Sequence, residues 1–165
     1  MNKEEFLAKI ELAVRVFYKC DNILIELGVS ERVIEHRIAL YLEPLFKEWN
    51  VDCEYNRYGV KTKELENIRE CREGQRTDRI YPDIVIHERG SESRNNIAVI
   101  EIKAGREMDK CDEMKLALMT GEGNEDVAHK YEFGLWFGFY KTECRWILFK
   151  DGEQREGGAI KISER

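Results

Sequence analysis

Three charged residues, Asp83, Glu101 and Lys103, lie in or beside apolar segments where a buried strand would ordinarily carry no charge. Asp83 directly precedes an Ile-Val-Ile run at 84–86, and Glu101 and Lys103 interrupt the run that starts at residue 97. A buried charge costs several kcal/mol unless it is paired or binds a metal ion. Two carboxylates beside a lysine suit a divalent cation that acts on a phosphodiester. The ordinary alternative is a strand end where Glu101 and Lys103 emerge into solvent.

The two apolar runs predict a β-hairpin that would place these charges together. Runs of β-branched residues at 84–86 and 97–102 favour strands, and Gly, Ser and Asn residues at 90–96 favour a long connecting loop. Side chains alternate along a strand, so Glu101 and Lys103 share one face of the second strand. We expect this strand to be central in its sheet.

Pro82-Asp83 followed by Glu101-Ile102-Lys103 resembles the signature of the PD-(D/E)XK nuclease superfamily. The similarity extends to small bacterial members, which carry Glu-Arg and His-Arg on an early helix and Glu-Tyr-Asn-Arg on the next strand. The matching residues here are Glu31-Arg32, His36-Arg37 and Glu54-Tyr55-Asn56-Arg57, within a match from about 30 to about 140. The resemblance implies an α/β restriction-endonuclease-like core, with a mixed central β-sheet flanked by α-helices.

The resemblance also implies roles for individual residues. Asp83 and Glu101 would bind Mg²⁺ or Mn²⁺ together with the backbone carbonyl of Ile102, and Lys103 would assist the attacking water. An apolar stripe on the helix after Ser30 extends back to Glu35 and Glu31, and superfamily members often add a helical glutamate to the metal site. Glu31 is the first choice and Glu35 the alternative. Acidic residues in a first helical turn also simply complement the helix dipole.

Five polar residues are candidates for substrate binding, and Asp112 is a further candidate to reach the site from the helix after Lys103. A solvated surface is the alternative interpretation for these residues. The expected substrate is nucleic acid, with DNA preferred over RNA. The five candidates are His36, Arg37, Asn56, Arg57 and Lys115.

Composition limits the function classes. The chain has 165 residues, 42% of them hydrophobic, which suits a single domain over residues 1–165. A net charge of -6 excludes a general nucleic-acid coating protein but leaves room for a local basic groove. The five cysteines show no zinc or disulfide pattern, and no apolar run is long enough to cross a membrane. We therefore expect a cytoplasmic protein.

Periodicity predicts the remaining elements. We expect an N-terminal helix at 4–27, whose apolar stripe suits core packing or a homodimer face, and a charged loop or insertion at about 58–78. Further elements are expected at 30–42 (helix), 51–57 (strand), 108–120 (helix), 131–140, 145–150 and 159–162 (strands).

Two functions remain open beside a Mg²⁺-dependent nuclease. One is a non-catalytic restriction-endonuclease-like subunit that binds or assembles within a larger complex. The other is an α/β interaction domain whose charges are incidental, which predicts that Asp83, Glu101 and Lys103 do not converge in space.

Overall fold

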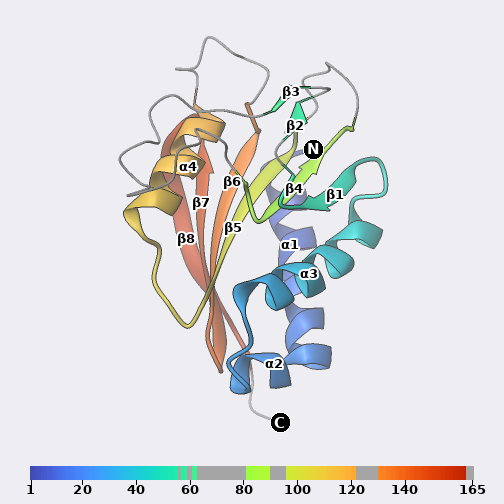
Figure 1. The fold of residues 1–165 in the computed structure, drawn as a ribbon, viewed down its shortest axis with the longest axis vertical. Coiled ribbons are helices and arrows are strands. Elements are labelled where there is room, and N and C mark those ends of the chain that lie inside the picture. Colours follow the sequence, from blue (N-terminus) through green and yellow to red (C-terminus); the bar gives the residue numbers. More distant parts are fainter. Residues whose placement is uncertain (56, 59–60, 63–80, 90–95, 122–129, 163–165) are drawn as a thin grey trace.

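A computed structural model describes residues 1–55, 57–58, 61–62, 81–89, 96–121 and 130–162. Within these residues the chain is a succession of helices and strands (Figure 1). The elements are α1 (Lys3–Asp21), α2 (Ile23–Glu26), α3 (Glu31–Leu42), a 3₁₀ turn (Glu43–Leu45), β1 (Asn50–Cys53), β2 (Arg57–Tyr58), β3 (Lys61–Thr62), β4 (Ile84–His87), β5 (Ala98–Ala104), α4 (Lys110–Thr120), β6 (Phe133–Phe139), β7 (Glu143–Lys150) and β8 (Glu153–Lys161).

The main sheet has six strands in the order β1-β4-β5-β6-β7-β8 among the residues that the structure describes. Only β5 and β6 run parallel, and they are joined through α4, whereas every other neighbouring pair is antiparallel. The predicted β4–β5 hairpin, with β5 inside the sheet, is confirmed. A mixed central sheet flanked by helices is therefore confirmed as well, at the level of the α/β class.

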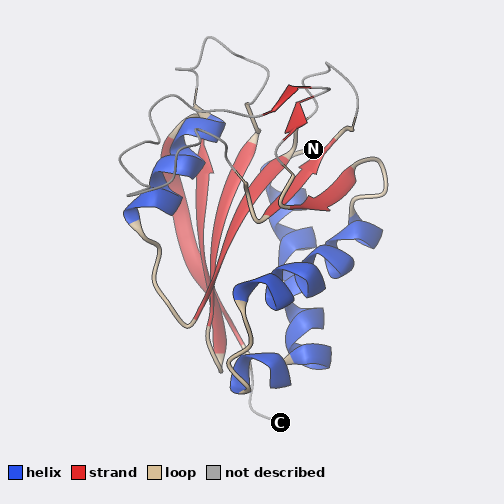
Figure 2. Cartoon of the chain, in the orientation of Figure 1, coloured by secondary structure: helices blue, strands red, loops and turns tan. Residues whose placement is uncertain are grey.

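Helices cover both faces of the sheet (Figure 2). α1 and α3 pack on one face, where Ile84, Ile86 and Ile100 belong to the larger hydrophobic core. α4 covers the other face through a smaller core that contains Val85 and Val99. The alternation of side chains along β4 and β5 thus divides each strand between two helical layers.

The N-terminal helix is shorter than the sequence predicts. The single helix expected at 4–27 is interrupted at Asn22, after which α2 forms one further turn. Asn22 keeps helical backbone angles, with φ of -52° and ψ of -31°, and its side-chain amide donates to the Glu26 carboxylate over 3.4 Å. Gly28, with φ of 64°, then ends the segment as expected.

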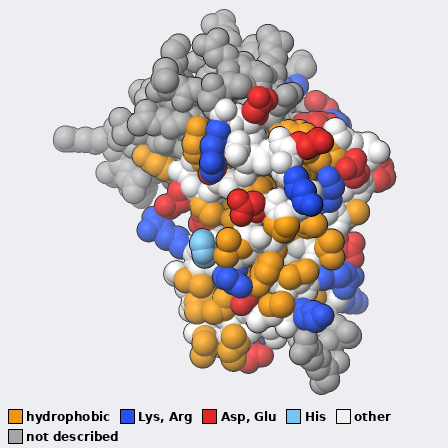
Figure 3. Space-filling model, turned by 90° about the vertical axis from the view of Figure 1, so that its right-hand side faces the viewer, with side chains coloured by type: hydrophobic (Ala, Val, Ile, Leu, Met, Phe, Trp, Pro, Cys, Tyr) orange, Lys and Arg blue, Asp and Glu red, His pale blue; other side chains and the backbone are white. Residues whose placement is uncertain are grey.

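The apolar stripe of α1 is core packing. Phe6, Ile10, Val14 and Phe17 are all buried within the chain. Figure 3 shows the side of the molecule that lies at the right in Figure 1, and hydrophobic and charged side chains are interspersed on it. The homodimer expected as one alternative stays a prediction.

Two conformational details define the ends of the next elements. α3 begins after Ser30, which lies at the N-cap position without a capping hydrogen bond from its side chain, and Pro44 falls in the 3₁₀ turn that follows the helix. The predicted strand at 51–57 stops at Cys53, because Glu54 adopts a left-handed φ of 48°.

Of the charged segment at 58–78, residues 59–60 and 63–78 lie outside the described residues.

Close packing of α4 on β6 explains a glycine in that strand. A Cβ at Gly134 would lie 3.1 Å from Thr120 Cγ2 and 3.3 Å from Leu116 Cδ2, both on α4. The helix-packing role predicted for the β6 glycines is thereby confirmed at Gly134. The β7–β8 turn at Asp151-Gly152 is also confirmed, with φ values of 53° and 79°.

None of the helices in the described part of the chain is both long and apolar enough to cross a membrane. The four cysteines within the described ranges, Cys20, Cys53, Cys111 and Cys144, are free thiols.

Candidate active site

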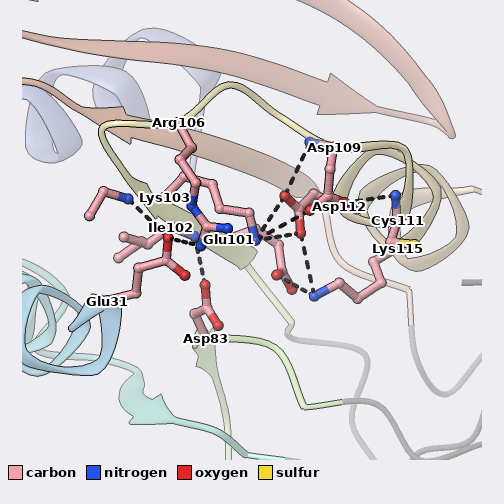
Figure 4. A network of polar contacts seen from close by, with 11 residues as sticks. Glu31, Asp83, Glu101, Ile102, Lys103, Arg106, Asp109, Cys111, Asp112 and Lys115 are labelled. Carbon is pink, nitrogen blue, oxygen red and sulfur yellow. Dashed lines mark hydrogen bonds and ion pairs between the residues drawn. The ribbon is translucent and has the colours of Figure 1, made fainter. Parts of the chain in front are cut away.

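The motif residues meet where β5 extends beyond β4. The hairpin register pairs Val85 with Val99 and Ile84 with Ile100, so Asp83 lies next in line opposite Glu101. Glu101 and Lys103 both point toward α4, as their separation by two residues requires. Figure 4 shows the resulting network, which joins α3, the start of β4, β5 and α4.

Two carboxylates satisfy the free edge of β5. Beyond the last β4 pair, the Ile102 N–H donates to Asp83 Oδ2 over 2.6 Å, and the Ala104 N–H donates to Glu31 Oε1 over 3.1 Å. An unpaired buried N–H is costly, so these bonds replace the missing strand partner. The N–H and C=O of one strand residue point to the same edge, which places the Ile102 carbonyl on the Asp83 side.

Glu101 is the most deeply buried acid of the network. Its side chain is 1% exposed, and Oε2 accepts a hydrogen bond from Lys115. The other oxygen, Oε1, has no hydrogen-bond partner among the described residues. Burial raises the pKa of Glu101, the Lys115 ammonium opposes that rise, and the nearby Asp83 adds to it. One buried acceptor therefore remains without a ligand.

Burial affects the carboxyl group of Asp83 in the same direction as that of Glu101. Burial raises the pKa of this carboxyl, and the hydrogen bond from Ile102 and the charges of Lys115 and Lys103 only partly offset the effect. Two acids with raised pKa values thus interact with each other across neighbouring strands. Acids whose pKa values are strongly raised by burial and a neighbouring charge are common at functional sites.

Lys103 turns to the N-terminus of α4. Its Nζ lies 3.1 Å from each carboxylate oxygen of Asp112 and 3.7 Å from Asp109 Oδ2. Burial alone would lower the pKa of Lys103, but Asp112 and Asp109 raise it, so the ammonium stays protonated. Asp109 and Asp112 also form the capping box of α4, which fixes both carboxylates by helix geometry.

Lys115 lies one turn further along α4 and contacts the second motif acid. Its Nζ binds Glu101 Oε2 and lies 3.8 Å from Asp112 Oδ1. Burial works to lower the pKa of Lys115, but Glu101 and Asp83 raise it. Lys115 is therefore a buried cation surrounded by acids.

The two glutamates proposed from α3 differ in their surroundings. Glu31 accepts hydrogen bonds from Ala104 and, at 2.5 Å, from Arg106, so it already has two donors. Glu35 is 4% exposed, and its pKa rises to about 7 because of burial and the charge of Asp83. Glu35 is therefore a helix acid that interacts electrostatically with Asp83. Neither metal role is tested by this geometry.

The other candidates for substrate contact are not part of this network, or their side chains are not among those that the structure describes. His36 is exposed, and Arg37 donates to Asp21 and Tyr41 at 2.7 Å each, which ties α3 to α1. Asn56 lies outside the described residues, and for Arg57 only the backbone of β2 is described. Their substrate roles stay predictions.

Sequence reasoning did not identify Asp109 or Arg106 as members of the network. The signal for Asp109 was present, because two acids spaced by three at the start of a predicted helix are typical of a capping box. Arg106 had no such signal, since its pairing with Glu31 depends on α3 lying beside the end of β5.

The residues of the network offer the oxygen donors that a divalent cation prefers. Across the described ranges, no group of three or more His, Cys, Asp or Glu side chains is arranged to hold a metal ion. A site of two carboxylates and one carbonyl needs fewer acids, and Glu101 offers a buried oxygen without a partner among the described residues. The ammonium groups of Lys103 and Lys115 bind Asp112 and Glu101 respectively, and so lie beside these donors.

No protein-family model matches the chain, and a comparison with curated proteins finds no relative.

Proposed function

We propose that this chain is a metal-dependent phosphodiester hydrolase acting on nucleic acid, built on a restriction-endonuclease-like core. The observation that carries the proposal is the meeting of Asp83 and Glu101 at paired strands, with Lys103 two residues further along the same face. A structural role for these charges would leave the buried Glu101 Oε1 unexplained.

Mg²⁺ or Mn²⁺ would be held by Asp83, Glu101 and the carbonyl of Ile102, with Glu35 or Glu31 as the acid from α3. When bound, the cation would neutralise the phosphate and polarise it toward attack by water. The Ile102 N–H orients Asp83 through its 2.6 Å hydrogen bond, so the acid nearest the strand edge is preorganised.

Lys103 supplies a positive charge beside these acids, two residues after Glu101 on β5. Its ammonium stays protonated through Asp112 and, on this proposal, would donate a hydrogen bond to a phosphate oxygen or an attacking water. Burial of the surrounding acids lowers the local dielectric, which strengthens such an interaction relative to water. Asp112 positions Lys103 and, on this proposal, makes no contact with substrate.

A second function is favoured by the contact between Lys115 and Glu101. The Lys115 ammonium donates to one oxygen of a carboxylate that is proposed as a metal ligand. Such internal pairing suits a non-catalytic subunit of the same fold, which would bind or assemble with partners in a larger complex. Metal binding separates the two functions, because the non-catalytic subunit has no need of it.

The test is cleavage of labelled duplex, single-stranded and branched DNA, and of RNA, with Mg²⁺ or Mn²⁺. The wild-type chain should cut at least one of them, DNA before RNA, and Asp83→Asn and Lys103→Ala should each lose about 100-fold or more in rate. Lys110→Ala removes an exposed lysine at the start of α4, which lies outside the network, and should leave the rate unchanged. Cleavage that persists in both site variants would contradict the assignment.

A further inference from the structure

Lys115 is a cation that the proposed chemistry does not use. It comes from the second turn of α4, and its side chain is only 16% exposed. Its Nζ binds Glu101 Oε2, and Asp83 acts on it as a further negative charge. In Figure 4 its side chain extends from α4 toward Glu101, on the side of the network opposite Glu31.

The position of this ammonium conflicts with a metal at the same carboxylate. Glu101 has one oxygen bound to Lys115 and one buried oxygen for which the described part of the chain offers no partner. A divalent cation on Glu101 would therefore lie within a few ångströms of a like charge, in a region with little solvent to screen the repulsion. Both cations cannot keep full contact with this carboxylate.

A second acceptor for Lys115 lies close by. Asp112 Oδ1 is 3.8 Å from Lys115 Nζ, and Asp112 precedes Lys115 by three residues on the same face of α4. A rotation of the lysine side chain would move the ammonium from Glu101 toward Asp112 without any shift of the helix. Asp112 also binds Lys103, so this movement would bring two ammonium groups to one carboxylate.

We propose that Lys115 is the resident counter-ion of the metal site, which occupies Glu101 in the metal-free protein and is displaced toward Asp112 when a divalent cation binds. The inference rests on the proposed function, because it assumes that Glu101 is a metal ligand. It assigns Lys115 a positioning and regulatory role: it holds the acids together without metal and weakens the binding of the metal by competition.

This role differs from the substrate contact that the sequence predicts for Lys115. A lysine that only contacts a phosphate should, when neutralised, weaken nucleic-acid binding and leave metal binding unchanged. A lysine that competes with the metal should, when neutralised, strengthen metal binding in the absence of any nucleic acid. Metal affinity of the protein alone therefore separates the two roles.

The experiment is calorimetric titration of the full chain with Mn²⁺ alone, using wild type, Lys115→Met and Lys110→Met. Methionine keeps much of the length of lysine without its charge. We expect Lys115→Met to bind Mn²⁺ about tenfold more tightly than wild type, because a competing like charge is gone. Lys110→Met is the matched control: it removes an exposed lysine of α4 that lies outside the network, so its loss should leave the affinity unchanged.

Thermal unfolding supplies a second readout. Lys115→Met leaves Glu101 buried without its cation, so its melting temperature without metal should fall below that of wild type. Added Mn²⁺ should then raise the melting temperature of Lys115→Met more than that of wild type. If the variant does not fold without metal, refolding that requires Mn²⁺ supports the same conclusion, and failure to fold with Mn²⁺ contradicts it.

The negative outcomes distinguish the inference from the proposed function. Mn²⁺ binding by wild type that is equal or weaker in Lys115→Met overturns the role of Lys115 and leaves the metal site standing. Absence of Mn²⁺ binding in both folded proteins overturns this role and the proposed metal site together. Loss of binding in Glu101→Gln, with wild type binding, identifies Glu101 as the ligand in question.

Discussion

The carboxylate of Asp83 accepts a hydrogen bond from the backbone N–H of Ile102 at 2.6 Å, and so joins the start of β4 to the residue between Glu101 and Lys103. This contact does two things at once. It supplies a partner for an N–H at the free edge of β5, and it fixes the acid in front of that edge. Structural and chemical roles of Asp83 can therefore be separated by substitution.

Asp83→Asn and Asp83→Ala should differ in stability but not in metal binding. The amide oxygen of Asp83→Asn can still accept from Ile102, and the variant no longer carries a buried charge, so its stability should equal or exceed that of wild type. Asp83→Ala leaves the N–H unpaired and should lose about 1–3 kcal/mol of unfolding free energy. Urea denaturation measures the difference, and equal midpoints for the two variants would contradict it.

Glu35 should make stability depend on pH. The pKa of Glu35 is about 7 in the folded chain and 4.5 for an unperturbed glutamate, so the contribution of the protonated acid to stability is complete below pH 4.5 and is lost as the pH rises through 7. Glu35→Gln removes this loss and should gain up to about 3 kcal/mol relative to wild type between pH 5 and pH 8.

The measurement for Glu35 is urea denaturation of both proteins from pH 5 to pH 8. The difference between the two curves isolates Glu35 from other titrating acids such as Asp83 and Glu101. Glu31→Gln serves as the control, because Glu31 is committed to Ala104 and Arg106 and its substitution should not reproduce the Glu35 curve. Parallel curves for wild type and Glu35→Gln would refute the role of Glu35.

The pairing of Lys103 with Asp112 should be worth more than a surface ion pair. Both side chains are largely buried and Lys103 contacts both carboxylate oxygens, so a double-mutant cycle with Lys103→Met and Asp112→Asn should give about 1–3 kcal/mol of coupling. The half-exposed pair Arg15–Glu11 on α1 is the matched comparison and should give about 0.5 kcal/mol or less. Equal coupling in the two cycles would contradict the buried network.

Gly134→Ala should push α4 away from the sheet. The new methyl group would meet Thr120 Cγ2 and Phe149 Cβ at 3.1 Å each, and overpacking of this kind costs about 1–3 kcal/mol. Thr120→Ser removes the clashing methyl group and keeps the hydroxyl that donates to Leu116. Thermal melting should show partial recovery in the double variant, and no recovery would mean that Phe149 or Leu116, rather than Thr120, sets the clash.

The hairpin and the faces of its residues could be predicted from the sequence, because β-branched runs and a period of two report directly on strands. Glu101 and Lys103 on one face follow from that period alone. The different contacts of Glu31 and Glu35 could not be predicted, since both lie on one stripe of α3 and only the position of the end of β5 distinguishes them. The contact of Lys115 with Glu101 likewise depends on how α4 lies across the sheet.

Three consecutive residues at the end of β5 are each held by a different element: Ile102 by Asp83 before β4, Lys103 by Asp112 on α4, and Ala104 by Glu31 on α3. Strand ends normally fray, and their amide protons exchange with solvent quickly. Here the amides of Ile102 and Ala104 should instead exchange about as slowly as those in the middle of the strand. The place where chemistry is proposed would then be among the last parts of the molecule to open.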